Sequence, residues 1–368
     1  MGALQRTETT GIGAAVLTID LAAIVANWRA LAARAPGAAC AAVVKADAYG
    51  LGMAQVAPAL ARAGCRTFFV ALPEEGIALR RLLGAAPEII VLHGPPAGGE
   101  PGFAAHALLP VLNSTAQAEA WAAFGRARGA ALPAALQFDT GMARLGLRPD
   151  AAAALRGRSD LEVALVLSHL ACADDPADPA NEAQLAAFRA LRRLWPEARA
   201  SLAASFGIFL GADYHFDLLR PGAALYGIAP TQGPNPLQDV VRLQAPVIQT
   251  RAVAAGAGTG YGLTWRAARP TLLATLGIGY ADGLPRSLSN RGAAWLGAQA
   301  LPIVGRVSMD STIVDAGTLP AAALPPGTLL DLIGPEAGLD AVAEQAGTVG
   351  YELLTRLGRR FARRYLDG

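Results

Sequence analysis

Eight short apolar runs recur along the first 220 residues of the sequence, and stretches with helical spacing, such as 73–83, 114–128 and 181–195, separate most of them. Apolar runs of this length, bounded by turn residues, predict strands that are buried on both faces. Strands that alternate with helices are typical of parallel α/β folds, either a closed (β/α)8 barrel of about 250 residues or an open doubly wound sheet. The expected strands are 38–44, 66–71, 88–92, 108–112, 133–138, 161–167, 199–203 and 216–219.

Residues with reactive or charged side chains follow several of these expected strands closely. They are Lys45, Arg144, His169, Ser205 and Arg220. In a barrel the carboxyl ends of all strands surround one mouth, so such residues would converge in space. We therefore expect a (β/α)8 barrel, while an open doubly wound sheet stays the alternative, because alternation alone does not separate the two folds.

The pattern changes after Tyr226, where Pro and Gly residues interrupt any helical continuation. We expect an α/β chain with two domains: a TIM-like (β/α)8 barrel over 14–235, and a mainly β C-terminal domain over 236–368, with which residues 1–13 could also pack. A final helix is expected near 348–365, with the basic run from Arg356 to Arg364 on its solvated face. The expected C-terminal β segments are 246–251, 271–276, 302–307, 312–314 and 328–333.

Composition narrows the classes of protein to which this chain can belong. Hydrophobic residues make up 53% and charged residues 16% of the chain, which favours a compact protein over a disordered one. A formal net charge of +2 gives no reason to expect a nucleic-acid partner. No segment has the pattern of a membrane span or a signal peptide, so we expect a cytoplasmic protein without a membrane partner. Cys40, Cys65 and Cys172 lack the spacing of a zinc site, and no metal is expected.

Lys45 stands where the first of the eight expected strands runs into a loop rich in glycine. A lysine that loses solvent has a lowered pKa and becomes able to form a Schiff base, although a solvated loop lysine is an equally good interpretation of this stretch alone. The segment Lys-Ala-Asp-Ala-Tyr-Gly-Leu-Gly, residues 45–52, resembles the pyridoxal-phosphate signature of bacterial alanine racemases, which are enzymes of fold type III. The resemblance implies that Lys45 holds pyridoxal 5'-phosphate covalently.

Later segments resemble the same family, in the same order, over nearly the whole chain from about residue 20 to 364. They are 139–146, 168–174, 219–227, 259–265, 277–286 and 305–310. The resemblance implies that the cofactor is bound by Lys45, Tyr49, His169, Ser205, Arg220, Gly222, Ala223 and Tyr351, that the substrate is bound by Arg144, Met309 and Tyr280, and that Asp174, Arg286 and Arg306 line the entrance.

Racemisation requires one proton to leave one face of the Cα atom and another to return on the opposite face. By the resemblance, Lys45 is the catalytic base on the D-alanine side, and Tyr261, entering from the other subunit of a homodimer, is the base on the L-alanine side. Arg220 resembles the arginine that hydrogen-bonds the pyridine nitrogen, and His169 resembles the histidine that orients it. Because an arginine keeps its proton, the cofactor ring would be a weaker electron sink, which restricts side reactions such as transamination.

The residues taken singly leave other interpretations open. A histidine that ends an apolar strand is more often a core residue, Tyr49 and Tyr351 could be core aromatics, and Arg220 could form a structural ion pair.

Three positions depart from a common family pattern. Gln137 occupies the place where many members have a carbamylated lysine, and its uncharged amide is expected to hold Arg144 less firmly. Ala204 and Ser308 stand where Asn and Cys are frequent, and we assign neither a catalytic role.

The resemblance implies interconversion of L- and D-alanine, with D-alanine supplied for peptidoglycan. A serine racemase or a racemase of broader specificity remains an alternative, because one sequence does not define the volume of the pocket. A decarboxylase on the same barrel is disfavoured, because Arg220 stands where a carboxylate would strengthen the electron sink. A non-catalytic pyridoxal-phosphate-binding barrel is disfavoured by the second domain that carries Tyr261.

Overall fold

The structure is a computed structural model that describes residues 5–7, 14–230, 233–317 and 319–367. The chain divides into two compact units: a barrel unit of residues 24–238 and a second unit of residues 1–23 and 239–368. Residues 14–23, which the sequence-based division assigned to the barrel, are grouped with the second unit because β2 (Val16–Asp20) pairs with strands of that unit.

The barrel unit consists of parallel strands. Seven of them form one sheet in the order β10-β9-β8-β7-β6-β5-β4, and β11 pairs with β3. The strands are β3 (Ala39–Cys40), β4 (Ala42–Val43), β5 (Thr67–Val70), β6 (Glu88–Val91), β7 (Leu109–Leu112), β8 (Leu132–Gln137), β9 (Leu161–Leu167), β10 (Arg199–Ser201) and β11 (Leu218–Leu219).

Backbone hydrogen bonds close this sheet into a barrel. The strands β3 and β4 follow each other as one strand. Between them, Ala41 N–H donates a hydrogen bond to the Leu219 oxygen of β11 at 3.0 Å. On the other side of β11, Asp217 N–H donates to the Ala200 oxygen at 3.0 Å, at the start of β10. Every strand therefore has two neighbours, and the expected TIM-like barrel is confirmed over the open doubly wound alternative. All eight expected strands are present, most of them shorter at one or both ends than the sequence predicts.

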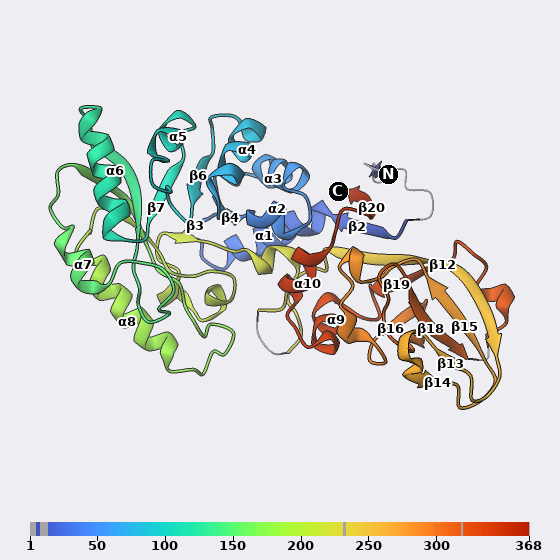
Figure 1. Cartoon of the computed structure of the whole chain (residues 1–368). Helices are drawn as coiled ribbons and strands as arrows, with labels where there is room; N and C mark the ends of the chain where they lie inside the picture. The colour runs from blue at the N-terminus through green and yellow to red at the C-terminus, as the bar shows by residue number, and fades with distance from the viewer. Residues whose placement is uncertain (1–4, 8–13, 231–232, 318, 368) are drawn as a thin grey trace. The chain divides into compact units, whose positions relative to one another are not determined.

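Helices cover the outside of the barrel (Figure 1), while apolar side chains fill its interior. The interior cluster includes Val43, Phe69, Ile90, Val111 and Leu167. The helices of this region are α1 (Leu21–Ala33), α2 (Lys45–Tyr49), α3 (Met53–Arg62), α4 (Pro73–Leu83), α5 (Glu100–Ala105), α6 (Thr115–Ala127), α7 (Pro149–Ala154) and α8 (Ala180–Arg192), with 3-10 turns at η1 (Phe206–Phe209), η2 (Ala212–Tyr214) and η3 (Ala223–Tyr226).

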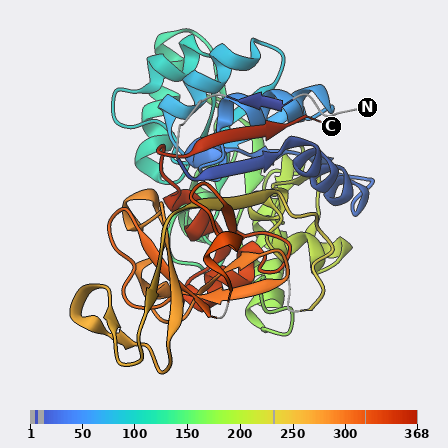
Figure 2. The same ribbon diagram turned by 90° about the vertical axis from the view of Figure 1, so that its right-hand side faces the viewer.

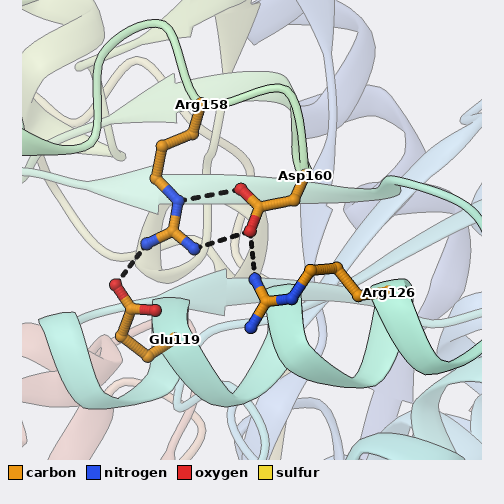
Figure 3. Close-up of polar contacts among 4 residues, drawn as sticks. All are labelled: Glu119, Arg126, Arg158 and Asp160. Carbon is orange, nitrogen blue, oxygen red and sulfur yellow. Dashed lines mark hydrogen bonds and ion pairs between the residues drawn. The ribbon is translucent and has the colours of Figure 1, made fainter.

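A network of charged side chains joins helix α6 to the segment that begins strand β9 (Figure 3). Arg158 donates to both carboxylate oxygens of Asp160, at 2.8 Å each, and also to Glu119 on α6. Arg126, in the last turn of the same helix, also donates to Asp160. The network, chiefly its hydrogen bond with Arg158, holds the pKa of the Asp160 carboxyl well below its usual value. Four charges that share hydrogen bonds in this way stabilise more than an isolated surface pair does.

The second unit is mainly β, as expected, and its longest strand organises it. The thirteen residues of β12 (Val241–Val253) pair with β2 over 241–244, with β19 (Leu329–Ile333) over 243–246 and with β15 (Thr271–Leu276) over 247–253. The remaining strands are β1 (Gln5–Thr7), β13 (Gly258–Thr259), β14 (Trp265–Arg266), β16 (Ala293–Leu296), β17 (Gln299–Pro302), β18 (Thr312–Gly317) and β20 (Ala362–Leu366), and the helices are α9 (Leu339–Ala346) and α10 (Gly350–Arg356).

The expected final helix is only partly present. Helix α10 ends at Arg356, and the chain continues as strand β20. This strand lies between β1 and β2 (Figure 2), where it buries Ala362 and Tyr365. Sheet pairing therefore satisfies the backbone that the prediction placed in a helix, and the prediction of one helix with a solvated basic face was wrong. The expected strand 302–307 is also wrong beyond Pro302, where β17 ends.

Among the described residues, no helix is both long enough and apolar enough to cross a membrane.

Candidate active site

Lys45 follows the barrel strand β4, separated from it only by the buried Val44. Its side chain is partly buried, and this burial lowers the pKa of the Lys45 amine. The positive charge of Arg144 lowers this pKa further, while the negative charge of Glu75 raises it. Lys45 is also the only lysine in the sequence. The structure therefore agrees with the first interpretation of this stretch, a desolvated lysine whose amine is closer to its nucleophilic form.

The backbone after Lys45 is left-handed over four successive residues that are not glycine. Ala46, Asp47, Ala48 and Tyr49 have φ angles of 52°, 54°, 53° and 56°. Such residues cost about 1–2 kcal/mol each, so surrounding contacts must hold them in place. No pattern in the sequence predicted this turn.

Arg220 directly follows the barrel strand β11 and is buried, with only 4% of its surface exposed. Its guanidinium donates to Ser201 Oγ at 2.6 Å and to the Ser168 backbone oxygen at 2.6 Å, and no described residue forms an ion pair with it. Burial lowers the pKa of Arg220 to about 10, so the side chain is charged at neutral pH. The interpretation of Arg220 as half of a structural ion pair therefore finds no partner among the residues that the structure describes.

His169 lies two residues after the end of β9, and its surroundings are positively charged. Burial, chiefly, and the charges of Arg220, Arg144 and Lys45 lower the pKa of His169 to about 3. The histidine is therefore neutral at physiological pH. That each of these three cations acts on one imidazole indicates that the four side chains lie near one another, as expected for residues at the carboxyl ends of strands that surround one barrel mouth.

Backbone N–H groups and two hydroxyls meet at the start of the 3-10 turn η3. Ser205 Oγ accepts hydrogen bonds from Gly222 N–H at 2.9 Å and from Ala224 N–H at 3.1 Å. A Cβ atom added at Gly222 would overlap the Tyr49 hydroxyl, so this hydroxyl lies directly against the glycine. Tyr49, Ser205, Gly222 and Ala223 thus come together. Because Ser205 Oγ accepts from these two amides, its own hydrogen can be donated to an anion such as phosphate.

Arg144 is exposed and lies in a loop that Asp139 orders. Asp139 Oδ1 accepts hydrogen bonds from Gly141 N–H and Ala143 N–H at 3.0 Å each, and these bonds lower the pKa of Asp139. Gln137 is buried and donates to the Leu145 oxygen at 3.4 Å. Among the described contacts, Gln137 makes no hydrogen bond to the Arg144 side chain.

The other expected site residues are exposed, and all of them except Asp174 lie in the second unit. Tyr261 is 71% exposed in η4 (Tyr261–Leu263), between β13 and β14. Tyr280, Met309 and Tyr351 are exposed apolar side chains, and Tyr280 N–H donates to the Ser308 oxygen at 3.0 Å, which brings the Tyr280 and Met309 segments together. Arg286 and Arg306 are exposed, as is Asp174 in the barrel unit. A cavity of about 530 Å³ is lined by Tyr280, Ala281, Gly283, Leu284, Pro285, Arg286 and Arg356.

Two further residues that the sequence did not single out, Arg360 and Glu75, hold segments of the expected site. Arg360 pairs with Asp282 at 2.9 Å and with Asp310 at 2.7 Å. Asp282 lies two residues after Tyr280, and Asp310 directly follows Met309. Glu75 accepts a hydrogen bond from Ala46 N–H at 2.6 Å, beside Lys45. Only a charge pattern around known site residues could have indicated them, because each lies far from its partners in the sequence.

The chain is a closed parallel barrel joined to a mainly β unit. The barrel carries a desolvated lysine, a buried arginine and donors that suit an anion, and this set of groups suits a ligand with a carbonyl group and a phosphate. Comparisons with known proteins agree. Residues 19–230 match the family described as "Alanine racemase, N-terminal domain", and residues 240–365 match "Alanine racemase, C-terminal domain". The chain belongs to the alanine racemase family.

Individual relatives cover almost the whole chain. A protein from Agrobacterium fabrum named "Alanine racemase, catabolic" is 52% identical over 99% of this chain and 95% of its own length. An alanine racemase from Rhodospirillum rubrum is 49% identical over 95% of this chain and 96% of its own. Among solved structures, alanine racemase from Bartonella henselae with covalently bound pyridoxal phosphate is 44% identical, with a TM-score of 0.92 over 96% of this chain and 100% of that chain.

Proposed function

We propose that this protein is a pyridoxal-phosphate-dependent alanine racemase that interconverts L- and D-alanine. The observation that carries this proposal is the desolvated Lys45 near Arg144, Arg220 and the neutral His169 at the end of barrel strands. Its family and the covalently bound pyridoxal phosphate of the Bartonella henselae relative support the same cofactor here.

The residues of the barrel unit fit this cofactor. Lys45 supplies the amine that bonds covalently to the aldehyde, and the buried Arg220, which has no acidic partner among the described residues, can donate to the pyridine nitrogen. Neutral His169 lies near this arginine and can accept a hydrogen bond from it. The donors for the phosphate are Tyr49, Ser205, Gly222, Ala223 and Tyr351. When bound, pyridoxal phosphate acidifies the hydrogen on the Cα atom of an amino acid by delocalising negative charge.

Two groups on opposite faces then exchange protons with the substrate. Lys45 Nζ removes or returns the Cα proton on the D-alanine side, and the phenol oxygen of Tyr261 of the partner subunit does so on the L-alanine side. Arg144 and the backbone N–H of Met309 bind the substrate carboxylate, because both are hydrogen-bond donors. Tyr280 narrows the site, and Asp174, Arg286 and Arg306 line its entrance. The exposure of Tyr261 supports a homodimer with shared active sites.

We propose that the protein supplies D-alanine for peptidoglycan from the cytoplasm. A catabolic role is the second candidate, because the relatives from Agrobacterium fabrum and Mesorhizobium japonicum, 52% and 54% identical, are both named catabolic. A deletion strain separates the two roles: biosynthesis makes growth depend on added D-alanine, whereas catabolism makes growth on alanine as the carbon source depend on the gene.

The proposed activity is tested with the purified protein. We expect a visible absorption band that borohydride removes, with the reduced cofactor found on the peptide that contains Lys45, together with racemisation of L-alanine. Lys45→Ala is expected to lose both. A band retained in Lys45→Ala, or no racemisation by the wild type, would contradict the proposal. Relative rates on L-alanine, L-serine and L-lysine test the alternative of broader specificity.

Activity is expected not to depend on carbon dioxide. Gln137 replaces the lysine that is carbamylated in many relatives, and the chain contains no lysine except Lys45. The rate should therefore be the same in degassed buffer and in bicarbonate, whereas a Gln137→Lys variant provides a carbamylation site as a positive control. A bicarbonate-dependent rate in the wild type would show that this inference is wrong.

A further inference from the structure

The carboxylate of Glu75 joins two barrel segments at the site of Lys45. Glu75 lies in the first turn of α4 and accepts Ala46 N–H on Oε1 at 2.6 Å. Its other oxygen, Oε2, accepts Ala71 N–H at 2.8 Å and Leu72 N–H at 3.0 Å. The end of strand β5 and the first left-handed residue after Lys45 are thus tied to one side chain.

A carboxyl group has an acceptor oxygen on each side, and this set of hydrogen bonds requires both. All three partners are N–H donors, and they occupy both oxygens. A glutamine at the same position has an acceptor on one side only, and its NH2 group would face an N–H group on the other. The geometry therefore fits the two acceptor oxygens of glutamate better than the amide of glutamine.

The same carboxylate is the acidic group that acts on Lys45. The charged groups that influence the amine are Arg144 from the loop after β8 and Glu75 from α4. The amine itself acts on His169 after β9, as does Arg220 after β11, and Asp47 and Tyr49 lie on the same turn as the lysine. Burial and Arg144 favour the neutral amine, and Glu75 alone among the named influences on Lys45 opposes them.

The downstream part of the turn has hydrogen bonds of its own. Ala48 N–H donates to the Val44 oxygen, Gly50 N–H donates to the Ala46 oxygen, and Met53 N–H donates to Asp47 Oδ1. The amide of Ala46, next to the lysine itself, is held from outside the turn by α4. The end of the turn nearest the reactive amine thus depends on α4.

We infer that Glu75 is a positioning residue for Lys45: it holds the left-handed turn that carries the lysine and keeps a negative charge beside the amine. This inference rests on the proposed function, in which Lys45 is the cofactor lysine and a base. A Lys45 amine without Glu75 would lose its proton at lower pH and would be held less firmly in front of the substrate.

The single lysine of the chain makes a direct test possible. The full-length protein is labelled with 13C-lysine and freed of cofactor, and the one Lys45 Cε signal is titrated with pH. Glu75→Gln is compared with Glu74→Gln, which removes the same charge from an exposed neighbour in the same helical turn. We expect Glu75→Gln to lower the midpoint by about 0.5 pH unit or more, and Glu74→Gln to leave it near the wild-type value.

A conservative variant separates charge from position. Glu75→Asp keeps the charge on a shorter side chain, so the titration midpoint should stay nearer to that of the wild type, while hydrogen exchange of the segment 46–49 accelerates. In the holoenzyme, kcat for Glu75→Gln should fall by about 10- to 100-fold with a smaller change in KM. Equal midpoints in Glu75→Gln and Glu74→Gln would overturn the inference. Because the titration needs no cofactor, this result differs from failure of the proposed function, which would appear as a wild type that does not racemise alanine.

Discussion

A buried arginine without an acidic partner is an expensive residue, because burial disfavours its charge unless hydrogen bonds or an opposite charge compensate. The described acceptors of Arg220 are a serine hydroxyl and backbone oxygens, all of them neutral. These acceptors orient the guanidinium but do not neutralise it. We therefore expect Arg220 to contribute more to ligand binding than to the stability of the barrel, because an electron-rich ligand atom would complete its environment.

The substitution of Gly222 by alanine, which adds one methyl group, tests the proposed phosphate site. Gly222→Ala places a Cβ atom against the Tyr49 hydroxyl, which must move, so we expect the Kd for pyridoxal phosphate to rise by about tenfold or more. The Kd is measured by absorbance titration of cofactor-free protein. Gly37→Ala is the matched control, because nothing lies within 4 Å of the added atom there. Wild-type affinity in Gly222→Ala would argue against phosphate at this glycine.

His169 predicts how stability depends on pH. The unfolded chain protonates this histidine below about pH 6.5, whereas the folded protein does so only near pH 3, so the unfolded state binds more protons between these values. The free energy of unfolding should therefore fall as the pH drops from 6.5 towards 3.

His169→Gln removes this contribution and isolates it from other groups. Between pH 7 and pH 5, the wild type should lose about 1–2 kcal/mol more than the variant, measured by urea denaturation of cofactor-free protein. A parallel loss in both proteins would mean that the histidine is not held in its neutral form.

At the scale of elements, one side chain holds two segments of the second unit, each of which carries a residue proposed to bind the substrate. Arg360, in the turn between α10 and β20, pairs with Asp282 in η5 (Tyr280–Asp282) and with Asp310 after Met309. Gly279 packs so closely against the 308–309 backbone that a Cβ atom there would collide with both carbonyl oxygens. The arginine thus fastens a contact that the glycine makes possible.

Arg360→Met is expected to raise KM for alanine by about tenfold, because Tyr280 and the Met309 N–H lose their common support. Steady-state kinetics measure this effect, with Arg359→Met as the control, since Arg359 is its exposed neighbour. If both variants behave alike, Arg360 contributes only general surface charge.

The sequence predicted the strands of the barrel because each is a short apolar run between turn residues, and α4 because Pro73 begins it and Gly84 follows it. It did not predict β20, whose partner β2 is more than 300 residues away in the chain. Local pattern carries no information about such pairing, and Arg359–Arg364 resemble a solvated helix until the sheet is known. Glu75 was missed for the same reason: its acceptor role depends on an amide 29 residues earlier.

At the scale of the whole molecule, the proposed homodimer predicts complementation between two inactive variants. Lys45→Ala and Tyr261→Phe each disable both sites of a homodimer. If Tyr261 serves the site of the neighbouring subunit, a mixed dimer contains one intact site, and one that lacks both groups.

Co-expression in equal amounts should therefore restore about a quarter of wild-type activity, because half of the dimers are mixed and each has one of two sites. The measurement is racemisation by the unfractionated co-expressed protein, and mixed dimers isolated through two different affinity tags should reach about half of wild-type activity. Separately purified and unmixed variants are the control. Activity no higher than that of the parents would mean that Lys45 and Tyr261 do not act across subunits.

The presence of one lysine in 368 residues has a practical consequence. Every other side-chain cation is an arginine or a histidine, so an amine-directed reagent meets a single side-chain target in each subunit. Once the terminal amine is subtracted, the moles of label incorporated count the subunits whose lysine is still free, and loading with the vitamin-derived aldehyde can be quantified without any enzymatic assay.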